Sequence, residues 1–565
     1  MPRRLVAILA TALLVFASCS SDDGGDEDAD ATTTTSVAGD SDTTTEAATD
    51  APDEGACDQG ATTDEVEAVP VEGTPSDWDV TSFDGTTIRA HWFPVPEPAG
   101  ADAAPAPTIL MGPGWSQPGD TSQEGTPILG ALSIRAMNER DYNVLTWDPR
   151  GFGASTGTAT VNAPDAEGRD VQILLDWIAA QPAARTDADG DPRVGMVGAS
   201  YGGGIQLTVA GIDCRVDALV PNIAWHSLET SLYPHETVKA GWAGVLSSVA
   251  AGARLDPHIV SANTSGQETG TLSDEDHQWF VDRGPGDLVE QIRTPTLLVH
   301  GTVDTLFTLN EAVTNFEILQ ANDVPVSMLW YCGGHGACLT DPGDPADITD
   351  ASFAWLDRYL RDDADDAGDD GTVVSVIDQE GQRWIGDDYP TDSDSDASLG
   401  AGSSGGTLAL TAESVAGPLV DAASADLLTG LVSPITPARA ETALELGIDL
   451  DDEALILGAP HLSLTYTGTA PDGPEPTRVF AQLVDEARDV VVGNQITAIP
   501  VELDGAEHTV EIDMEIVAQH VRAGDRLVLQ IVATTPAYAT PRLGGSIEVS
   551  AMSVELPTTE ALTAA

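Results

Sequence analysis

The sequence predicts an α/β fold, in which helices cover a mostly parallel sheet, followed by an all-β domain. Short runs rich in β-branched residues alternate with amphipathic stretches along the first part of the chain. One connection between two such runs is about seventy residues long, whereas a plain crossover needs about a dozen. Beyond a charged linker at residues 362–371, the helical period gives way to short alternating strands separated by Gly, Pro and Asp turns.

The N-terminal residues resemble a bacterial export signal. Arg3 and Arg4 precede an apolar run at residues 5–16, which is too short to span a bilayer. Small residues then lead to Cys19, as in a lipoprotein lipobox. We therefore expect residues 1–18 to be a lipoprotein signal peptide and Cys19 to be lipidated, so that the protein is extracytoplasmic and held on the cell membrane by its lipid anchor alone. The alternative is a conventional signal peptide and a secreted protein.

Residues 19–68 are expected to form a disordered acidic tether rich in Thr and Asp. Between residues 20 and 67 the chain has sixteen Asp or Glu and no Lys or Arg. The whole 565-residue chain has 92 acidic and 23 basic side chains, a formal charge of −69, and a hydrophobic fraction of 41%. This charge excludes nucleic acid as a partner, while the hydrophobic fraction is sufficient for folded cores.

The α/β domain is assigned to residues 69–222 and 293–361. Its buried strands are expected at residues 108–111, 142–147, 193–197, 216–220, 296–299 and 326–330. Its amphipathic helices are expected at residues 128–139, 165–180, 309–320 and 347–360. The insertion at residues 223–292 is predicted to be a helical cap over one end of the sheet.

A β-sandwich domain is assigned to residues 372–558. Its strands are expected at residues 372–377, 406–410, 462–467, 478–484, 509–514, 526–532 and 546–554.

Ser200 lies in the sequence Gly-Ala-Ser-Tyr-Gly at residues 198–202, between an expected strand and an expected helix. A serine on a sharp turn from strand to helix projects its hydroxyl from the end of the sheet, and the flanking glycines relieve crowding there. The amino terminus of the following helix also favours a developing oxyanion. This placement predicts that Ser200 is a catalytic nucleophile.

A nucleophilic serine needs a base and an orienting carboxylate. Asp304 and His335 each follow a later strand, and the order Ser, Asp, His matches the order in which such residues occur in this kind of fold. We predict that His335 is the base and Asp304 its orienting acid. The backbone amide of Tyr201 is the expected first oxyanion donor, and the second should come from the loop that contains Trp115.

The remaining four cysteines, if Cys19 is lipidated, allow three pairings. We favour Cys332–Cys338 with Cys57–Cys214. A metal site formed by Cys332, His335 and Cys338 is the alternative, but no fourth ligand is evident. The acidic run at residues 187–191 fails the pattern of a calcium loop, because Pro192 stands where the turn glycine belongs. No metal and no cofactor are predicted.

Several motifs together resemble those of the cocaine esterase and Xaa-Pro dipeptidyl-peptidase family. They are residues 198–203, the run Asp-Pro-Arg-Gly-Phe-Gly-Ala-Ser-Thr-Gly at residues 148–157, and the Asp304 and His335 loops. Residues 381–384 and 524–531 resemble the C-terminal galactose-binding-like jelly roll of that family. The resemblance implies an α/β-hydrolase fold with a helical cap and a jelly-roll domain.

The loop at Trp115 departs from the family pattern. Family members similar to cocaine esterase place a Tyr hydroxyl in the oxyanion hole where this chain has Trp115. An indole can donate only through its Nε1–H group, so either that group or a loop amide is expected to serve.

The predicted function is that of a serine hydrolase that cleaves an ester or amide through an acyl-enzyme, with a small-molecule ester or a short peptide as substrate. A carboxylic ester hydrolase is the first expectation and an Xaa-Pro dipeptidyl-peptidase the alternative. A dipeptidyl-peptidase needs a carboxylate for the substrate α-amino group, and the cap offers Glu229, Glu236 and Glu268. A catalytically inert carbohydrate-binding surface lipoprotein is the alternative from another class.

Overall fold

The structure is a computed structural model, and its described residues all fall within one compact unit. The described residues are 61–63, 65–96, 104–124, 132–361, 372–390, 397–403, 405–419, 431–474, 476–539 and 542–565. The predicted signal peptide, Cys19, Cys57 and the linker at residues 362–371 lie outside this set.

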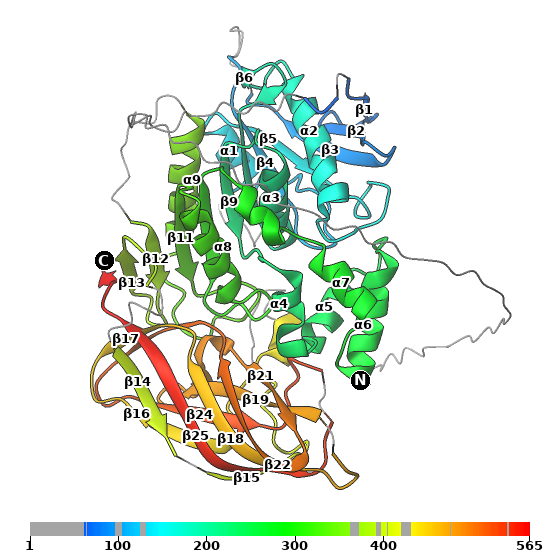
Figure 1. Cartoon of the computed structure of the whole chain (residues 1–565). Helices are drawn as coiled ribbons and strands as arrows, with labels where there is room; N and C mark the ends of the chain where they lie inside the picture. Colours follow the sequence, from blue (N-terminus) through cyan, green and yellow to red (C-terminus); the bar gives the residue numbers. More distant parts are fainter. Residues whose placement is uncertain are drawn as a thin grey trace, which may run out of the picture. The chain divides into compact units, whose positions relative to one another are not determined.

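A mixed sheet, twelve-stranded over the described residues, forms the centre of the α/β domain, which contains the predicted catalytic residues and is called the catalytic domain below (Figure 1). In spatial order its strands are β1 (Ala68–Pro70), β2 (Asp77–Thr81), β3 (Thr87–Phe93), β5 (Asn143–Trp147), β4 (Thr108–Gly112), β8 (Val194–Ala199), β9 (Ala218–Asn222), β10 (Thr296–Gly301), β11 (Val326–Tyr331), β12 (Val374–Ile377), β13 (Arg383–Gly386) and β26 (Thr563–Ala564). From β5 to β12 all neighbours are parallel, and the strands at both edges are antiparallel. The predicted parallel sheet is therefore confirmed.

Helices cover both faces of this sheet. On one face lie α1 (Ile134–Asn138) and α9 (Ala346–Leu360), which share a core with alternate side chains of the parallel strands. On the other face lie α2 (Arg169–Ala179), α3 (Tyr201–Ile212) and α8 (Leu309–Ala321). A single π-helical turn, η1 (Pro164–Gly168), leads into α2. Because the parallel strands are covered on both faces, their sequences are mostly apolar and do not alternate between apolar and polar residues.

Residues 223–292 form a helical insertion between β9 and β10. Its elements are α4 (Leu228–Leu232), η2 (Pro234–Glu236), α5 (Ala240–Val249), α6 (Pro257–Thr269), α7 (Asp274–Val281) and η3 (Gly286–Gln291). The two ends of the insertion therefore join the sheet at the neighbouring strands β9 and β10, of which β9 lies next to β8.

The C-terminal part contains two antiparallel sheets that enclose a second core. One sheet contains β14 (Ala397–Gly402), β15 (Gly406–Ala409), β17 (Ala454–Gly458), β18 (His461–Thr469), β22 (Asp504–Asp513), β23 (Val517–Val521) and β25 (Ser546–Thr559). The other contains β16 (Leu444–Asp449), β19 (Pro476–Asp485), β20 (Val490–Val491), β21 (Thr497–Glu502) and β24 (Arg526–Val532). Two short 3₁₀ turns, η5 (Ser433–Ile435) and η6 (Val492–Asn494), lie in the connections. This arrangement is the expected β-sandwich.

The predicted start of the sandwich domain at residue 372 is wrong. The strand expected there is β12, which pairs in parallel with β11 and belongs to the catalytic sheet. Val374 and Val376 are fully buried in the core of that sheet. A short alternating strand has the same sequence pattern in either sheet, so only its tertiary pairing assigns it.

The prediction of disorder up to residue 68 is also wrong at its end. Thr62 donates its backbone N–H and its hydroxyl to Asp176, at 3.0 and 2.6 Å. Asp176 is buried and also accepts a hydrogen bond from buried Arg215 at 2.6 Å. Strand β1 then begins at Ala68. A buried charged group thus fixes the segment that enters the catalytic domain.

Candidate active site

Ser200 stands alone between the end of β8 and the start of α3. Its backbone has φ 57° and ψ −118°, a conformation that a non-glycine residue adopts at some energetic cost. The two flanking glycines lie in close backbone contact: a Cβ on Gly198 would come within 2.5 Å of the Gly202 carbonyl oxygen, and a Cβ on Gly202 would overlap the Gly112 carbonyl oxygen. The turn therefore requires glycine at both positions.

Asp304 is fully buried in the loop that follows β10. Its Oδ1 accepts the backbone N–H groups of Leu306 and Phe307, at 3.0 and 2.9 Å. Its Oδ2 accepts the backbone N–H of His335 at 2.9 Å. Burial would raise the pKa of this carboxyl, but the charge of His335 and the hydrogen bonds from the side chain and the backbone of that residue hold it below its ordinary value. Asp304 is therefore an ionised acceptor with a fixed orientation.

His335 joins the acid and the serine. Its Nδ1 lies 2.6 Å from Asp304 Oδ2, and its Nε2 lies 2.8 Å from Ser200 Oγ. A carboxylate only accepts, so Nδ1 donates to Asp304 and Nε2 is left to accept the serine hydroxyl proton. The rings of Trp242 and Phe307 stand edge-on to the imidazole, at centroid distances of 5.7 and 5.1 Å. The structure thus brings together the three residues that the sequence singled out.

A disulfide between Cys332 and Cys338 brackets the His335 loop, with the two Cα atoms 5.5 Å apart. This is the pairing expected for these two cysteines, and it removes the free thiolates that the zinc alternative needs. Cys214 is also disulfide-bonded, while Cys57, its expected partner, lies outside the described residues.

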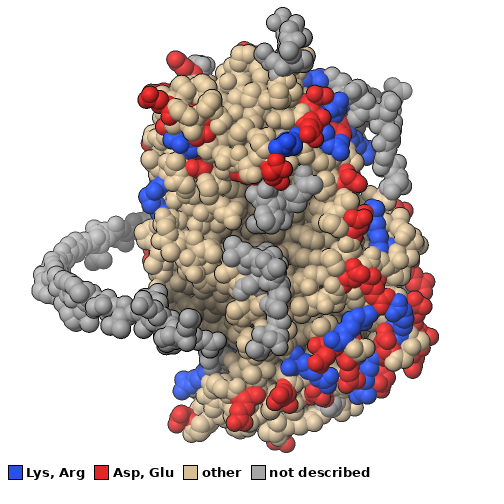
Figure 2. All heavy atoms as spheres, turned by 180° about the vertical axis from the view of Figure 1, so that it is seen from behind, with Lys and Arg blue, Asp and Glu red and all other residues tan. Residues whose placement is uncertain are grey.

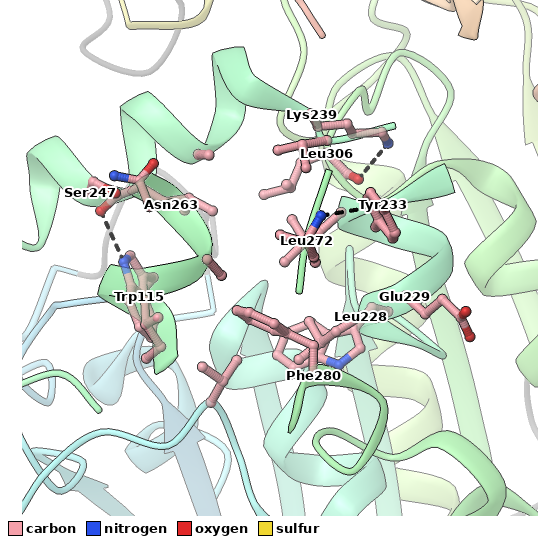
Figure 3. A pocket seen from close by; sticks show the side chains of 18 of the residues that line it. Trp115, Leu228, Glu229, Tyr233, Lys239, Ser247, Asn263, Leu272, Phe280 and Leu306 are labelled. Atoms are coloured by element: carbon pink, nitrogen blue, oxygen red, sulfur yellow. Dashed lines mark hydrogen bonds between the residues drawn. The ribbon is translucent and has the colours of Figure 1, made fainter. Parts of the chain in front are cut away.

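The predicted oxyanion donors differ in what they contact. Tyr201 is the first residue of α3, so its backbone N–H has no acceptor in its own helix. The indole Nε1–H of Trp115 instead donates to the carbonyl oxygen of Leu246 in α5, at 3.1 Å (Figure 3). The indole N–H of Trp115 is therefore already bonded to the cap. A backbone amide of the Trp115 loop remains as the candidate for the second oxyanion donor.

The side chain of Tyr201 leads to a buried carboxyl that the sequence did not single out. Its hydroxyl donates to Glu167 Oε1 at 3.2 Å. Glu167 also accepts the N–H and the hydroxyl of Thr160 and the N–H of Ala163. Burial raises the pKa of Glu167 above its ordinary value. No local pattern reveals this group, because its four hydrogen-bond donors come from a loop and from the next strand-to-helix turn.

The run at residues 148–157 supports the site through buried charges. Arg150 makes two hydrogen bonds of 2.7 Å to Asp170 in α2. Asp148 accepts the backbone N–H groups of Gly119 and Ala154, at 2.8 and 2.7 Å. These contacts hold the loop that carries Phe152 against Trp115 and Tyr201.

The other histidines of the catalytic domain do not reach Ser200. His300 lies 2.8 Å through Nε2 from the Phe307 carbonyl oxygen, and His226 lies 2.9 Å through Nδ1 from Asn315 Oδ1. The acidic run at residues 187–191 spans a two-stranded hairpin of β6 (Thr186–Ala188) and β7 (Asp191–Pro192). Asp187 there accepts hydrogen bonds from Arg193.

A pocket opens beside Ser200 and holds about 1000 Å³ of empty space, counted to its open mouth (Figure 3). Most of its wall is apolar and is formed by Trp115, Val161, Trp225, Leu228, Leu232, Val238, Ala243, Leu246, Leu255, Ile259, Ala262, Leu272, Phe280, Leu306 and Phe307. Besides Ser200, the polar residues in the wall are Tyr201, Glu229, Tyr233, Lys239, Ser247, Asn263 and His277. Because most of these residues belong to the insertion, the cap determines the shape of the pocket.

Two charged residues in this wall are already engaged. Glu229 points away from the pocket in Figure 3, its side chain is 47% exposed, and its Oε1 lies 2.8 Å from His277 Nε2. Lys239, the single lysine of the chain, is buried and donates through Nζ to the Leu306 carbonyl oxygen at 2.9 Å. Burial lowers the pKa of Lys239. Glu229 is the one carboxylate among the described wall residues, so none of them directs a carboxylate at Ser200.

The charges on the molecular surface are mixed. On the face shown in Figure 2, the basic side chains lie beside acidic ones, and the described part of that face has no continuous basic patch. None of the described helices is both long and apolar enough to cross a bilayer.

Comparison with known proteins gives one family match. Residues 84–337 match the X-Pro dipeptidyl-peptidase (S15) family. Dipeptidyl-peptidase 5 of Porphyromonas gingivalis is 27% identical over 235 residues, which cover 40% of this chain and 30% of that protein. An uncharacterized 31.7 kDa protein of Escherichia coli is 27% identical over 174 residues, which cover 30% of this chain and 57% of that protein. The chain thus spans less than two thirds of either relative.

Solved structures resemble the chain over most of its length. A CocE/NonD family hydrolase from Staphylococcus aureus has a TM-score of 0.60 at 13% identity, covering 87% of this chain and 96% of that one. An aminopeptidase from a marine sediment archaeon, Thaumarchaeota archaeon, has a TM-score of 0.56 at 13% identity, covering 88% and 95%. These likenesses extend the agreement in fold beyond the family match to the C-terminal domain.

Proposed function

We propose that this protein, a serine hydrolase whose residues 84–337 match the X-Pro dipeptidyl-peptidase (S15) family, is a carboxylic ester hydrolase that works through an acyl-enzyme. Ser200 attacks the ester carbonyl while His335 Nε2 takes the hydroxyl proton and later passes it to the leaving alcohol. Asp304 orients the imidazole and stabilises its positive charge. The Tyr201 backbone N–H and a loop amide near Trp115 hold the oxyanion. Water then attacks the acyl-enzyme with His335 again as base.

The apolar lining of the pocket is the observation that favours an ester substrate over a peptide. A peptidase that releases dipeptides from a free amino terminus must bind an α-ammonium group, and burying such a charge without a partner is costly. The apolar wall around Ser200 offers no facing carboxylate among its described residues, since Glu229 is directed away. An uncharged acyl or alcohol group fits this wall, because its transfer from water is favourable.

Xaa-Pro dipeptidyl-peptidase activity is the second candidate. The family match over residues 84–337 and the similarity to dipeptidyl-peptidase 5 favour it. An inert carbohydrate-binding lipoprotein is not favoured, because the serine, histidine and aspartate lie within bonding distance of one another.

The test compares p-nitrophenyl esters of short fatty acids with Ala-Pro-p-nitroanilide. We expect ester turnover and fluorophosphonate labelling, and the loss of both in Ser200→Ala. A higher kcat/KM for the anilide would assign the peptidase function instead. Labelling that persists in Ser200→Ala would exclude Ser200 as the nucleophile.

We also propose that the protein is exported and held on the membrane through lipidated Cys19, a position outside the described residues. Cys19→Ser should move the protein from the membrane fraction to the medium. Equal membrane retention of this variant would contradict lipidation, and release of the wild-type protein would indicate a secreted enzyme.

A further inference from the structure

A short segment of the β-sandwich reaches the two catalytic loops. This segment is η6 (Val492–Asn494) with Gln495, between β20 and β21. The side chain of Asn494 is 2% exposed and that of Gln495 is 5% exposed, although both are amides. Residues of this type are seldom so deeply buried unless their polar groups are bonded.

Both buried amides donate to loops that carry the acid and the base. Gln495 Nε2 donates to the backbone carbonyl oxygen of Asp304 at 2.8 Å. Asn494 Nδ2 donates to the carbonyl oxygen of Ala337 at 2.8 Å, two residues after His335. One dipeptide of the sandwich domain therefore spans the two loops whose separation sets the contact between Asp304 and His335.

The backbone of the segment is shaped for this contact. Gly493 and Asn494 are consecutive left-handed residues, with φ values of 60° and 55°. A Cβ on Gly493 would come within 3.1 Å of the Thr302 carbonyl oxygen in the acid loop. Glycine adopts this conformation without penalty, and asparagine is among the residues that tolerate it best. The Gly-Asn sequence thus allows the sandwich backbone to approach the acid loop closely.

The two catalytic loops have little regular structure of their own to fix them. Asp304 and His335 lie in irregular segments just after β10 and β11, and the disulfide joins the His335 loop only to itself. Each loop is therefore positioned by tertiary contacts. Among these contacts, the hydrogen bonds from the side-chain amides of Asn494 and Gln495 are buried and directional. Removing the donor of such a buried hydrogen bond leaves its acceptor without a partner, which costs more than the bond itself contributes.

We infer that Asn494 and Gln495 hold the loops of Asp304 and His335 in position. The β-sandwich therefore contributes to the geometry of the active site. The inference rests on the proposed role of Ser200, Asp304 and His335. Neither Asn494 nor Gln495 is among the residues that line the pocket, and their side-chain N–H groups donate to backbone carbonyl oxygens of the loops. Both are therefore positioning residues that act on the rate of acylation and leave substrate binding unaffected.

The test uses the full chain with Gln495→Met and Asn494→Gly. Methionine has nearly the length of glutamine but no donor, and glycine keeps the left-handed backbone that Asn494 adopts. We expect each variant to lower kcat on a p-nitrophenyl ester at least tenfold, with KM within twofold. The rate of fluorophosphonate labelling should fall by a similar factor, and this readout remains available if esters prove not to be the substrate.

Gln379→Met is the matched control. Gln379 Nε2 donates to the backbone carbonyl oxygen of His520 in β23, and its Oε1 accepts the N–H of the same residue. Both hydrogen bonds of this side chain therefore join the connection after β12 to the sandwich, and neither goes to Asp304 or His335. Gln379→Met removes only these two side-chain hydrogen bonds, so the variant should lose stability in urea but keep kcat and the labelling rate. Unchanged kcat and labelling in folded Gln495→Met and Asn494→Gly, or an equal loss in Gln379→Met, would overturn the inference.

Discussion

Gly336 packs directly against the carbonyl oxygen of Val303, so closely that a Cβ atom on Gly336 would overlap that oxygen. The two residues are the immediate neighbours of His335 and Asp304. Their contact therefore sets the distance between the base loop and the acid loop. A similarly close approach occurs on the other side of His335, where a Cβ on Gly334 would come within 2.7 Å of Asp304 Oδ2.

Gly336→Ala should lower kcat/KM for the preferred ester by about 100-fold or more, because displacing a catalytic group by about 1 Å has an effect of that size. Steady-state kinetics on the purified variant measures it. Gly252→Ala is the control: none of the described heavy atoms lies within 4 Å of a Cβ at that position, so activity should be retained. Equal activity of the two variants would show that the loop contact is not needed.

Trp115→Phe should leave kcat within about threefold of the wild-type value. The indole N–H is bonded to Leu246 in the cap, so removing it should not remove an oxyanion donor, and phenylalanine keeps the ring contacts with Phe152 and Tyr201. Loss of a real oxyanion donor lowers kcat by about 10²–10³-fold. A fall of that size would place the indole in the oxyanion hole and would exclude the loop amide as the second donor.

Tyr201→Phe separates the two parts of Tyr201. We propose that its backbone N–H serves the reaction, whereas its hydroxyl is bonded to Glu167 behind the turn. The variant should keep kcat within about threefold and lose about 1 kcal/mol in free energy of unfolding, the usual contribution of one hydrogen bond. Urea denaturation and ester kinetics on the same preparation measure both. A large loss of kcat without loss of stability would assign the hydroxyl to catalysis.

The residues that meet at the active site could be predicted because each is marked locally. Ser200 follows an apolar strand and has glycines two residues away on both sides, and Asp304 and His335 follow the later strands β10 and β11. Parallel strands end at one edge of the sheet, so residues that follow them converge there. Sequence order and strand position therefore contain most of the information on these three residues.

The residues that hold the catalytic loops in place could not be predicted in this way. Asn494 and Gln495 lie in a different domain from Asp304, and buried amides follow no periodic pattern. The engagement of the Trp115 indole depends on where helix α5 passes, which the sequence does not indicate. The assignment of β12 to the catalytic sheet likewise depends on its pairing with β11.

Asp217 directly precedes the central strand β9, at the end of the sheet opposite to Ser200. It should make the free energy of unfolding depend on pH. Burial raises its pKa to about 7, although it accepts the Val194 N–H, and the charges of Asp187 and Asp191 act in the same direction as burial. Arg193 opposes them. In the unfolded chain the group titrates near 3.8, so the folded protein retains a proton that the unfolded chain loses between these two values. The free energy of unfolding should therefore fall as pH rises from about 4 to 7 and then level off.

Asp217→Asn removes the ionisation and keeps an oxygen that can accept the Val194 N–H. Above pH 7 the free energy of unfolding of the variant should exceed that of the wild-type protein by up to about 4 kcal/mol. The partial exposure of this side chain reduces the difference. The gain should shrink steadily towards pH 4, where the carboxyl is protonated in the folded protein and increasingly so in the unfolded chain. Urea unfolding of both proteins at pH 4, 5.5 and 8 measures the difference. A gain that is the same at all three pH values would mean that the asparagine stabilises the strand for another reason, and no gain at pH 8 would mean that the surroundings of Asp217 solvate its charge.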